Sequence, residues 1–307
     1  MFTVNSVSIM SKYFTIFIST IIFSIPCTGQ AGNDNIPELR LTTITQANQG
    51  NSYITFPADI GNIEPLWFEG NLIPNFHIRE SKDSRLMGVI TPQIIIRMYQ
   101  ERSFPVRTPS YMPQISVYYM LSSKTEVNSL TVFGKLAHHS NGQDGDFYLE
   151  NGGINLKTGD FATNYYELGL IKTNYSPGLN AVQFFATSLE IHPPGLTNKE
   201  LRGIYGLYRW NTKFSIFKIP ANSNKNRKKA SFSIKGQTTW MLGDMNNWDT
   251  FSLNRLNLSL TFYYHPKFLE DIGLFVHAYH GMDYYNIYFD HQIDMVRFGI
   301  MTEKLRF

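Results

Sequence analysis

Apolar and polar residues alternate along much of this chain, with the period of a β-strand that has two unlike faces. The clearest alternation runs over residues 254–265, where one parity is apolar and consists of Leu256, Leu258, Leu260, Phe262 and Tyr264. The other parity is mainly polar and includes Asn257, Ser259, Thr261 and His265. After residue 30, no segment shows a sustained apolar pattern of helical period. The pattern therefore predicts an all-β protein.

Polar breaks divide the alternating region into twelve segments. We predict strands at 51–57, 64–79, 85–100, 111–122, 126–140, 161–173, 179–192, 202–217, 230–242, 254–265, 271–282 and 292–307. Strands of about 10 residues with one apolar face suit a bilayer, and an even number places both ends of a bacterial barrel on the periplasmic side. The pattern predicts a 12-stranded antiparallel transmembrane β-barrel over residues 51–307.

Alternation alone also fits a water-soluble β-sandwich or lipocalin-like barrel, in which the apolar face points inward. Two features favour the membrane barrel. The last predicted strand ends on Phe307, which resembles the insertion signal of outer-membrane barrels. Aromatic residues stand at predicted strand ends, as expected of interfacial girdles, namely Trp240, Tyr263, Tyr264, Tyr284 and Tyr285.

An apolar run at 13–26 follows Lys12 and precedes small and polar residues. The run is shorter than the roughly 20 residues that a membrane-spanning helix needs, so it predicts a secretory signal peptide over residues 1–31. Cleavage is expected between Gly29 and Gly32, leaving residues 32–50 as an N-terminal periplasmic segment. Cys27 is the only cysteine, so the exported protein would lack thiols and disulfides.

Composition narrows the classes of function. Hydrophobic residues make up 43% of the chain, yet its mean hydropathy is −0.21, unlike that of a helical membrane protein. A formal charge of +3 is too small to indicate a nucleic-acid partner. The basic run at 224–229 is most simply a solvated loop.

The predicted strand 126–140 carries the candidate chemistry. Its apolar parity, which includes Leu130, Val132 and Leu136, continues into His138 and Ser140. Polar groups on a lipid-facing surface are costly unless they have partners. Residues two apart on a strand point the same way with about 7 Å between α-carbons. The spacing therefore allows a serine nucleophile and a histidine base, while His139 is expected to face inward in a structural or solvated role.

A third polar residue shares the outward face. Asn164 has the parity of Tyr166 and Leu168 in the next predicted strand. If the two strands pair, Asn164 could accept the second imidazole N–H and hold the reactive tautomer. The stretch between Ser140 and Asn164 is long, so Asn151 and Asn155 are alternatives. The histidine and serine could also be an incidental or structural pair.

Four ordered groups of residues now resemble a known family, the bacterial outer-membrane phospholipase A. They are 103–107 with 111–114 (SFPVR, YMPQ), 138–142 (HHSNG), 162–166 (ATNYY), and 281–284 through 298–301 to Phe307 (GMDY, FGIM). The histidine–serine segment is the most specific of them. The family implies a calcium-dependent phospholipase of A1 and A2 type, which is active as a homodimer in the outer membrane and hydrolyses phospholipid acyl esters.

The resemblance also implies roles for individual residues. Ser140 would be the nucleophile, His138 the base and Asn164 the residue that orients His138, with an oxyanion site at the Gly142 amide. Calcium would be bound by Ser103, across the dimer interface, and by the backbone oxygen of Gln143. Independently, Asp144 and Asp146 offer the oxygen ligands that calcium prefers. Gln143 stands where the family usually has arginine, so this loop departs from the family pattern.

Two other classes of function remain open at this stage. One is a barrel without catalysis, either a small porin or a surface-binding protein. The other is a soluble β-sheet esterase, which would be recovered in the soluble periplasmic fraction.

Overall fold

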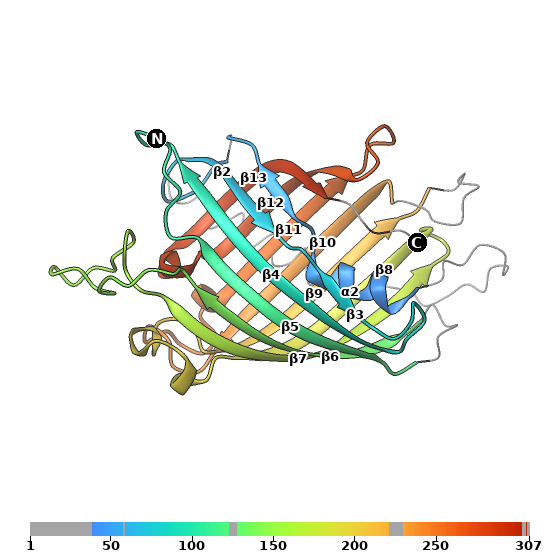
Figure 1. Ribbon diagram of the computed structural model, residues 1–307, viewed down its shortest axis with the longest axis horizontal. Helices are drawn as coiled ribbons and strands as arrows, with labels where there is room; N and C mark the ends of the chain where they lie inside the picture. Colours follow the sequence, from blue (N-terminus) through green and yellow to red (C-terminus); the bar gives the residue numbers. More distant parts are fainter. Residues whose placement is uncertain (1–38, 58, 123–127, 221–229, 303–304, 306–307) are drawn as a thin grey trace. The chain divides into compact units, whose positions relative to one another are not determined.

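The computed structural model describes residues 39–57, 59–122, 128–220, 230–302 and 305. Its described residues form one antiparallel sheet (Figure 1). The strands are β1 (Tyr53–Thr55), β2 (Leu66–Leu72), β3 (Phe76–Ile78), β4 (Leu86–Tyr99), β5 (Ser110–Met120), β6 (Leu130–Ser140), β7 (Ala162–Ser176), β8 (Ala181–Ile191), β9 (Tyr208–Lys218), β10 (Phe232–Leu242), β11 (Leu256–Tyr264), β12 (Ile272–Met282) and β13 (Gln292–Thr302). One short helix, α2 (Leu41–Gln49), precedes them.

The sheet closes into a barrel of twelve strands, as predicted. Strands β4 to β13 pair in sequence order, β13 pairs with β1, β1 with β2, and β2 with β4. β3 follows β2 along the same edge of β4 and does not add a position to the ring. Pro74 lies between β2 and β3, and proline cannot donate a hydrogen bond to the sheet.

Most of the strand predictions agree with the observed ladder, but the segment predicted at 64–79 is two strands, β2 and β3, and the strand predicted from 126 starts at Leu130. The strand predicted at 292–307 ends at Thr302. The segment predicted to begin at 202 starts at Tyr208. Residues 202–206 instead form a turn in which Gly203 and Gly206 have φ values of 79° and 68°. Residues other than glycine rarely adopt such φ values, so the two glycines favour a turn at this place. The strand β9 therefore begins only after the turn.

The two faces of the sheet have opposite chemistry. Outward side chains are apolar and exposed, for example Leu168 at 66%, Trp210 at 52% and Phe262 at 50%. Inward side chains include charged residues with almost no exposure, such as Glu69 at 0% and Arg297 at 1%. A water-soluble barrel would have the reverse distribution. The inside-out pattern is that of a membrane-spanning barrel. Among the described residues, no helix is long and apolar enough to cross a membrane.

Helix α2 lies inside the barrel, where strands surround it (Figure 1). Leu41, Ile44 and Ala47 are buried against inward residues of β4 to β9, including Met87, Tyr118, Phe133, Ile171, Phe184 and Phe217. The helix ends at Gly50, whose φ is 89° and whose N–H donates to the Gln46 carbonyl. A nine-residue helix is marginal by itself, so its packing inside the barrel stabilises it.

The other end of the barrel interior is filled by a second apolar cluster. We call this end the loop rim, because it carries the loops at 56–65, 100–109, 141–161, 192–207, 243–255 and 283–291. The cluster combines strand and loop residues, among them Tyr99, Phe147, Phe161, Leu201, Tyr205, Met241, Tyr285 and Phe289. Apolar groups therefore occupy the interior near both ends.

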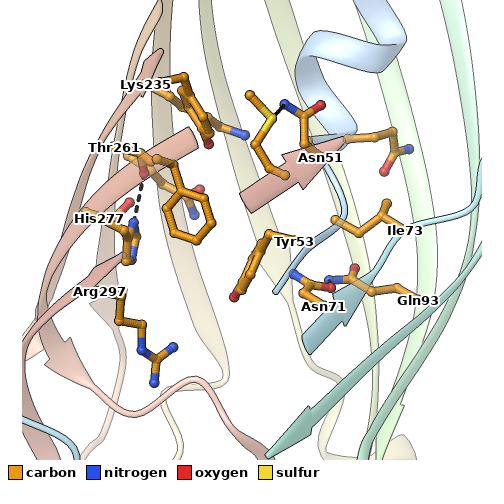
Figure 2. A pocket seen from close by; sticks show the side chains of 16 residues that line it. Asn51, Tyr53, Asn71, Ile73, Gln93, Lys235, Thr261, His277 and Arg297 are labelled. Carbon is orange, nitrogen blue, oxygen red and sulfur yellow. Dashed lines mark hydrogen bonds between the residues drawn. The ribbon is translucent and has the colours of Figure 1, made fainter. Parts of the chain in front are cut away.

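Between the two clusters the interior is polar and contains cavities of about 360 Å³ and about 200 Å³. Figure 2 shows the smaller cavity, into which polar side chains reach from both sides of the barrel: Asn71 and Gln93 on one side, Lys235, His277 and Arg297 on the other.

A buried ionic network ties β2, β4 and β13 to the loop at 283–291. Arg97 binds Glu69 at 2.7 Å and Asp283 at 2.6 Å, and Arg297 binds both Glu69 and Asp59. The network joins residues from four distant parts of the sequence, so it fastens the loop rim to the strands.

Two sets of sequence predictions need comment. Tyr284 and Tyr285 do not belong to an outer aromatic girdle: Tyr284 donates to Glu69 inside the barrel, and Tyr285 is completely buried. They turn inward because Asp283 and Asn286 bind groups in the interior, which is a correction to the sequence-based expectation. The signal peptide at 1–31, residues 32–38, the basic run at 224–229 and Phe307 lie outside the described residues.

Candidate active site at the loop rim

The pairing of β6 and β7 places the candidate triad residues together. The register sets His138 directly opposite Asn164 and Ser140 opposite Ala162. His138, Ser140 and Asn164 are half-buried on the outward face, whereas His139 and Thr163 are buried on the inward face. The single-residue alternation of a strand thus separates the two neighbouring histidines.

A hydrogen bond joins two of the three residues. His138 Nδ1 lies 3.0 Å from Asn164 Oδ1. Because an amide oxygen only accepts, the ring must carry its proton on Nδ1, which leaves the Nε2 lone pair available as a base. Asn151 and Asn155 bond within their own loop, to Gly153 N and to Asp146 O. Asn164 is therefore the asparagine that the fold brings to His138.

Ser140 follows His138 by two residues on the same face. Among the described residues, no hydrogen bond joins Ser140 Oγ to the His138 ring. Hydrogen bonds of this kind are often long in substrate-free enzymes and shorten when substrate binds. The three residues share the outward face at the loop-rim end of β6 and β7, with the serine at the end of its strand.

The edge of β6 that faces β5 is interrupted beside this site. Tyr111 pairs with Ser140 and Gln114 with Ala137, a register that places Pro113 beside His138. Proline has no N–H to donate to the ladder, which explains the gap in pairing here. His138 is thus flanked by Asn164 on one side and by a proline ring on the other.

The loop at 141–161 begins immediately after Ser140 and is closed at its base by Asn141. This side chain is fully buried; its Nδ2 donates to Gly159 O at 2.8 Å, and its Oδ1 accepts from Phe161 N and Gln143 N. The contacts hold the two ends of the loop together. As a result, the long stretch between Ser140 and Asn164 does not disturb the strand register. The sequence indicated no such role for Asn141, because its partners are main-chain groups.

We expect Asn141→Ala to loosen this loop. The variant would leave two buried main-chain N–H groups and one carbonyl without partners, which favours local opening. Trypsin cleavage after the exposed Lys157 is expected to accelerate by roughly five- to tenfold, as measured by limited proteolysis of folded protein. Asn151→Ala is the matched control, because the Asn151 side chain is exposed and accepts a hydrogen bond from Gly153 N within the same turn of the loop. Equal cleavage rates in the two variants would contradict the role of Asn141.

Gly142 lies beside Ser140 with a φ of 65°. A β-carbon at this position would approach Tyr111 Cε2 to 3.2 Å, so glycine is favoured by both backbone and space. Within the described residues, the Gly142 N–H takes part in no hydrogen bond. The amide is thus available to an anionic oxygen formed next to Ser140, as an oxyanion site requires.

The candidate calcium residues come from two loops of the loop rim. The described residues contain no group of three or more His, Cys, Asp or Glu side chains that could hold a metal ion. Asp144 and Asp146 are exposed, and Ser103 lies in the separate loop at 100–109 with a φ of 71°. The Gln143 carbonyl accepts no hydrogen bond within the described residues. These oxygen donors suit calcium chemically.

Comparison with known proteins identifies the fold. No protein-family model and no curated protein matches the sequence. Among solved structures, the chain is similar to outer membrane phospholipase A from Escherichia coli, with a TM-score of 0.59, 14% identity, and coverage of 87% of this chain and 99% of that one. It is also similar to the Salmonella typhi outer membrane phospholipase dimer with bound calcium, with a TM-score of 0.56, 14% identity, and coverage of 83% and 90%. The chain therefore has the barrel fold of the outer membrane phospholipase A structures, as the sequence resemblance implied.

Proposed function

We propose that this protein is an outer-membrane phospholipase that hydrolyses the acyl esters of phospholipids and lysophospholipids with Ser140, His138 and Asn164. The observation that carries the proposal is the 3.0 Å bond between His138 and Asn164 on the lipid-facing wall, with Ser140 two residues further along. Polar groups on such a surface are costly without a function. The similarity in fold to phospholipase structures supports the same reading.

Each residue has a defined part in the proposed reaction. Asn164 holds the His138 proton on Nδ1, so that Nε2 can remove the proton from Ser140 Oγ as the oxygen attacks the ester carbonyl carbon. The Gly142 N–H donates to the oxyanion of the tetrahedral intermediate. His138 then protonates the departing alcohol oxygen, and water, deprotonated by His138, releases the fatty acid from the acyl-serine.

The surface next to the site suits an acyl chain. Leu136 and Tyr166 are paired across β6 and β7, one step further from the loop rim than His138 and Asn164. Their side chains are 54% and 46% exposed, so they present an apolar wall directly beside the reacting groups. A substrate whose ester lies at Ser140 could extend its acyl chain along this wall.

A homodimer would complete the site. We propose that the Gln143 carbonyl and the Asp144 and Asp146 carboxylates bind calcium together with Ser103 of the partner subunit. Calcium, when bound there, would add positive charge near the oxyanion. The exposed carboxylates of Asp144 and Asp146 and the position of Ser103 in a separate loop fit this arrangement, and the Salmonella typhi neighbour is a dimer with bound calcium.

The structure offers little support for a small porin. Apolar clusters lie in the interior at α2 and at the loop rim, on either side of the polar cavities. An open diffusion channel needs a continuous polar path. The inside-out surface likewise argues against a soluble esterase.

Calcium removal tests the proposed function directly. Purified protein in detergent micelles with phospholipid and millimolar calcium should release fatty acid, and EDTA should reduce the release at least tenfold, because oxyanion stabilisation contributes about that much or more. Excess calcium, but not magnesium, should restore it. Barrel folding, followed by gel mobility before and after heating, should be unchanged by EDTA. Full activity in EDTA would contradict the calcium proposal, and absence of release at every calcium concentration would contradict the phospholipase proposal.

A further inference from the structure

The amide of Asn164 has a second partner besides His138. Its Nδ2 donates to the main-chain carbonyl of Leu196 at 3.0 Å. An asparagine side chain can rotate to exchange its oxygen and nitrogen, and only one orientation presents an acceptor to His138. In the reverse orientation, Oδ1 would face the Leu196 carbonyl oxygen and Nδ2 would face the imidazole. The Leu196 carbonyl therefore selects the orientation of Asn164 that can hold the His138 proton.

The segment that carries this carbonyl is fastened to β7. The leucine side chain is itself 46% exposed and does not anchor the segment. Instead, Thr197 and Thr163 form an isolated bridge, with their hydroxyl oxygens 2.9 Å apart, and Asn198 N donates to Ala162 O at 3.0 Å. Both threonine side chains are buried. The position of the Leu196 carbonyl thus depends on contacts made one residue away from it.

These hydroxyls belong to a chain of hydrogen bonds with a fixed direction. His192 contacts Glu190 Oε1 through Nε2 at 2.8 Å and Thr163 Oγ1 through Nδ1 at 2.9 Å. A carboxylate only accepts, so the Nε2 proton goes to Glu190. Burial, with the Arg209 charge, lowers the pKa of His192, which keeps the ring neutral and Nδ1 an acceptor.

The direction then follows from residue to residue. Thr163 donates its hydroxyl proton to His192 Nδ1, so the Thr163 oxygen accepts from the Thr197 hydroxyl. Glu190 is held in turn by Arg209 Nη1 at 3.2 Å and Asn211 Nδ2 at 3.1 Å. A carboxylate inside the barrel therefore determines how the hydroxyls next to Asn164 are oriented.

We propose that Thr197, Thr163 and His192 are positioning residues, which act through the Leu196 carbonyl to keep Asn164 in its productive orientation. The inference rests on the proposed phospholipase function and explains how an asparagine can serve there. A carboxylate presents an acceptor whichever way it is turned, whereas an amide must be held. The hydrogen bonds of Thr197, Thr163 and His192 fix the amide orientation from the interior side of the barrel wall.

Thr197→Val tests the proposal, because valine keeps the shape and removes the hydroxyl. With phospholipid in mixed micelles and saturating calcium, we expect kcat to fall by roughly three- to tenfold, the effect of one lost hydrogen bond, with KM unchanged. Thr197→Ser keeps the hydroxyl and should retain most of the activity. In an Asn164→Ala background, Thr197→Val should have no further effect, since the amide it positions is absent.

Thr173→Val is the matched control. Like Thr197, Thr173 is a buried threonine that bonds to a hydroxyl, that of Ser129 at 2.5 Å, but it lies in β7 at the end away from Asn164. If Thr197→Val has no larger effect on kcat than Thr173→Val, or if its effect persists without Asn164, the positioning role is wrong. A wild-type protein without activity would instead refute the proposed function, so the two failures are distinguishable.

Discussion

Ser140→Ala is expected to abolish fatty-acid release from phospholipid micelles while the barrel still folds. The serine oxygen is the atom that would form the acyl intermediate, and no other group can replace it in that step. Loss of a nucleophile in enzymes of this type lowers kcat by about 10⁴-fold or more. The measurement is release of fatty acid in detergent at saturating calcium, with gel mobility before and after heating as the check of folding.

Ser259→Ala is a suitable control for this prediction. Ser259 lies on β11 and lines the polar interior, away from the proposed site. Its replacement removes the same hydroxyl group and should leave the rate within about twofold of wild type, as is usual for sites without such a role. If Ser140→Ala released fatty acid at the wild-type rate, the nucleophile would have to be sought elsewhere in the chain.

The barrel could be predicted from the sequence because successive side chains of each strand face the lipid and the interior in turn. In such a strand every second side chain has the same environment, so the period of two is visible in the residues of β11 and β12 themselves. Strand order follows from short connections between antiparallel neighbours. The closing contact between β13 and β1 joins residues about 250 positions apart, and it follows only once a closed barrel has been assumed.

Helix α2 could not be predicted in the same way. Its nine residues include three threonines and no side-chain cap, so local preference for a helix is weak. What stabilises it is contact with strands β4 to β9, which are distant in sequence. The local sequence of such a segment does not predict its structure, because the contacts that stabilise the helix come from the rest of the barrel.

Part of the candidate site could also be predicted from the period of two along the strands. Strand parity distinguished His138 from His139, and the structure places the two on opposite faces of β6. Asn164 was selected by its parity and by the two tyrosines that follow it, since the length of the intervening loop gave no help. The contacts of Asn141 and the contact between Asn164 and the Leu196 carbonyl were not predicted, because each involves main-chain atoms, which every residue has. Asp144 and Asp146 offer oxygen ligands that suit calcium, but the described residues of the single chain contain no group of three or more His, Cys, Asp or Glu side chains that could hold a metal ion.

The interior of the barrel is where the fold is most sensitive to a single change. Arg97 is 3% exposed and binds Asp283 through both Nη1 and Nη2, at 2.6 and 2.8 Å, while its Nε binds Glu69 at 2.7 Å. Its guanidinium also stacks over Tyr285, 4.3 Å from the ring centre. This one side chain therefore connects β4 to β2 and to the loop that fills the rim.

We expect Arg97→Met to destabilise the barrel strongly. Methionine has a similar length but leaves Asp283 without its cation and Glu69 with Arg297 alone. Breaking a buried ion pair by removing one partner costs about 3 to 5 kcal/mol, mainly because the remaining charge is uncompensated. The free energy of unfolding in detergent, measured by urea titration, should therefore fall by roughly 4 kcal/mol. Arg102→Met, at an exposed arginine of the next loop, should change it by less than about 0.5 kcal/mol.

A second substitution identifies the cause of the loss. If uncompensated charge is responsible, adding Asp283→Asn to Arg97→Met should recover part of the stability, because the amide removes the carboxylate charge while keeping its shape. If the loss came only from packing against Tyr285, the double variant would be no more stable than Arg97→Met. Residual fatty-acid release should follow the folded fraction in both variants, since Arg97 lies in the interior and contacts none of His138, Ser140 and Asn164. A loss of kcat in fully folded Arg97→Met protein would therefore contradict the purely structural role assigned to this network.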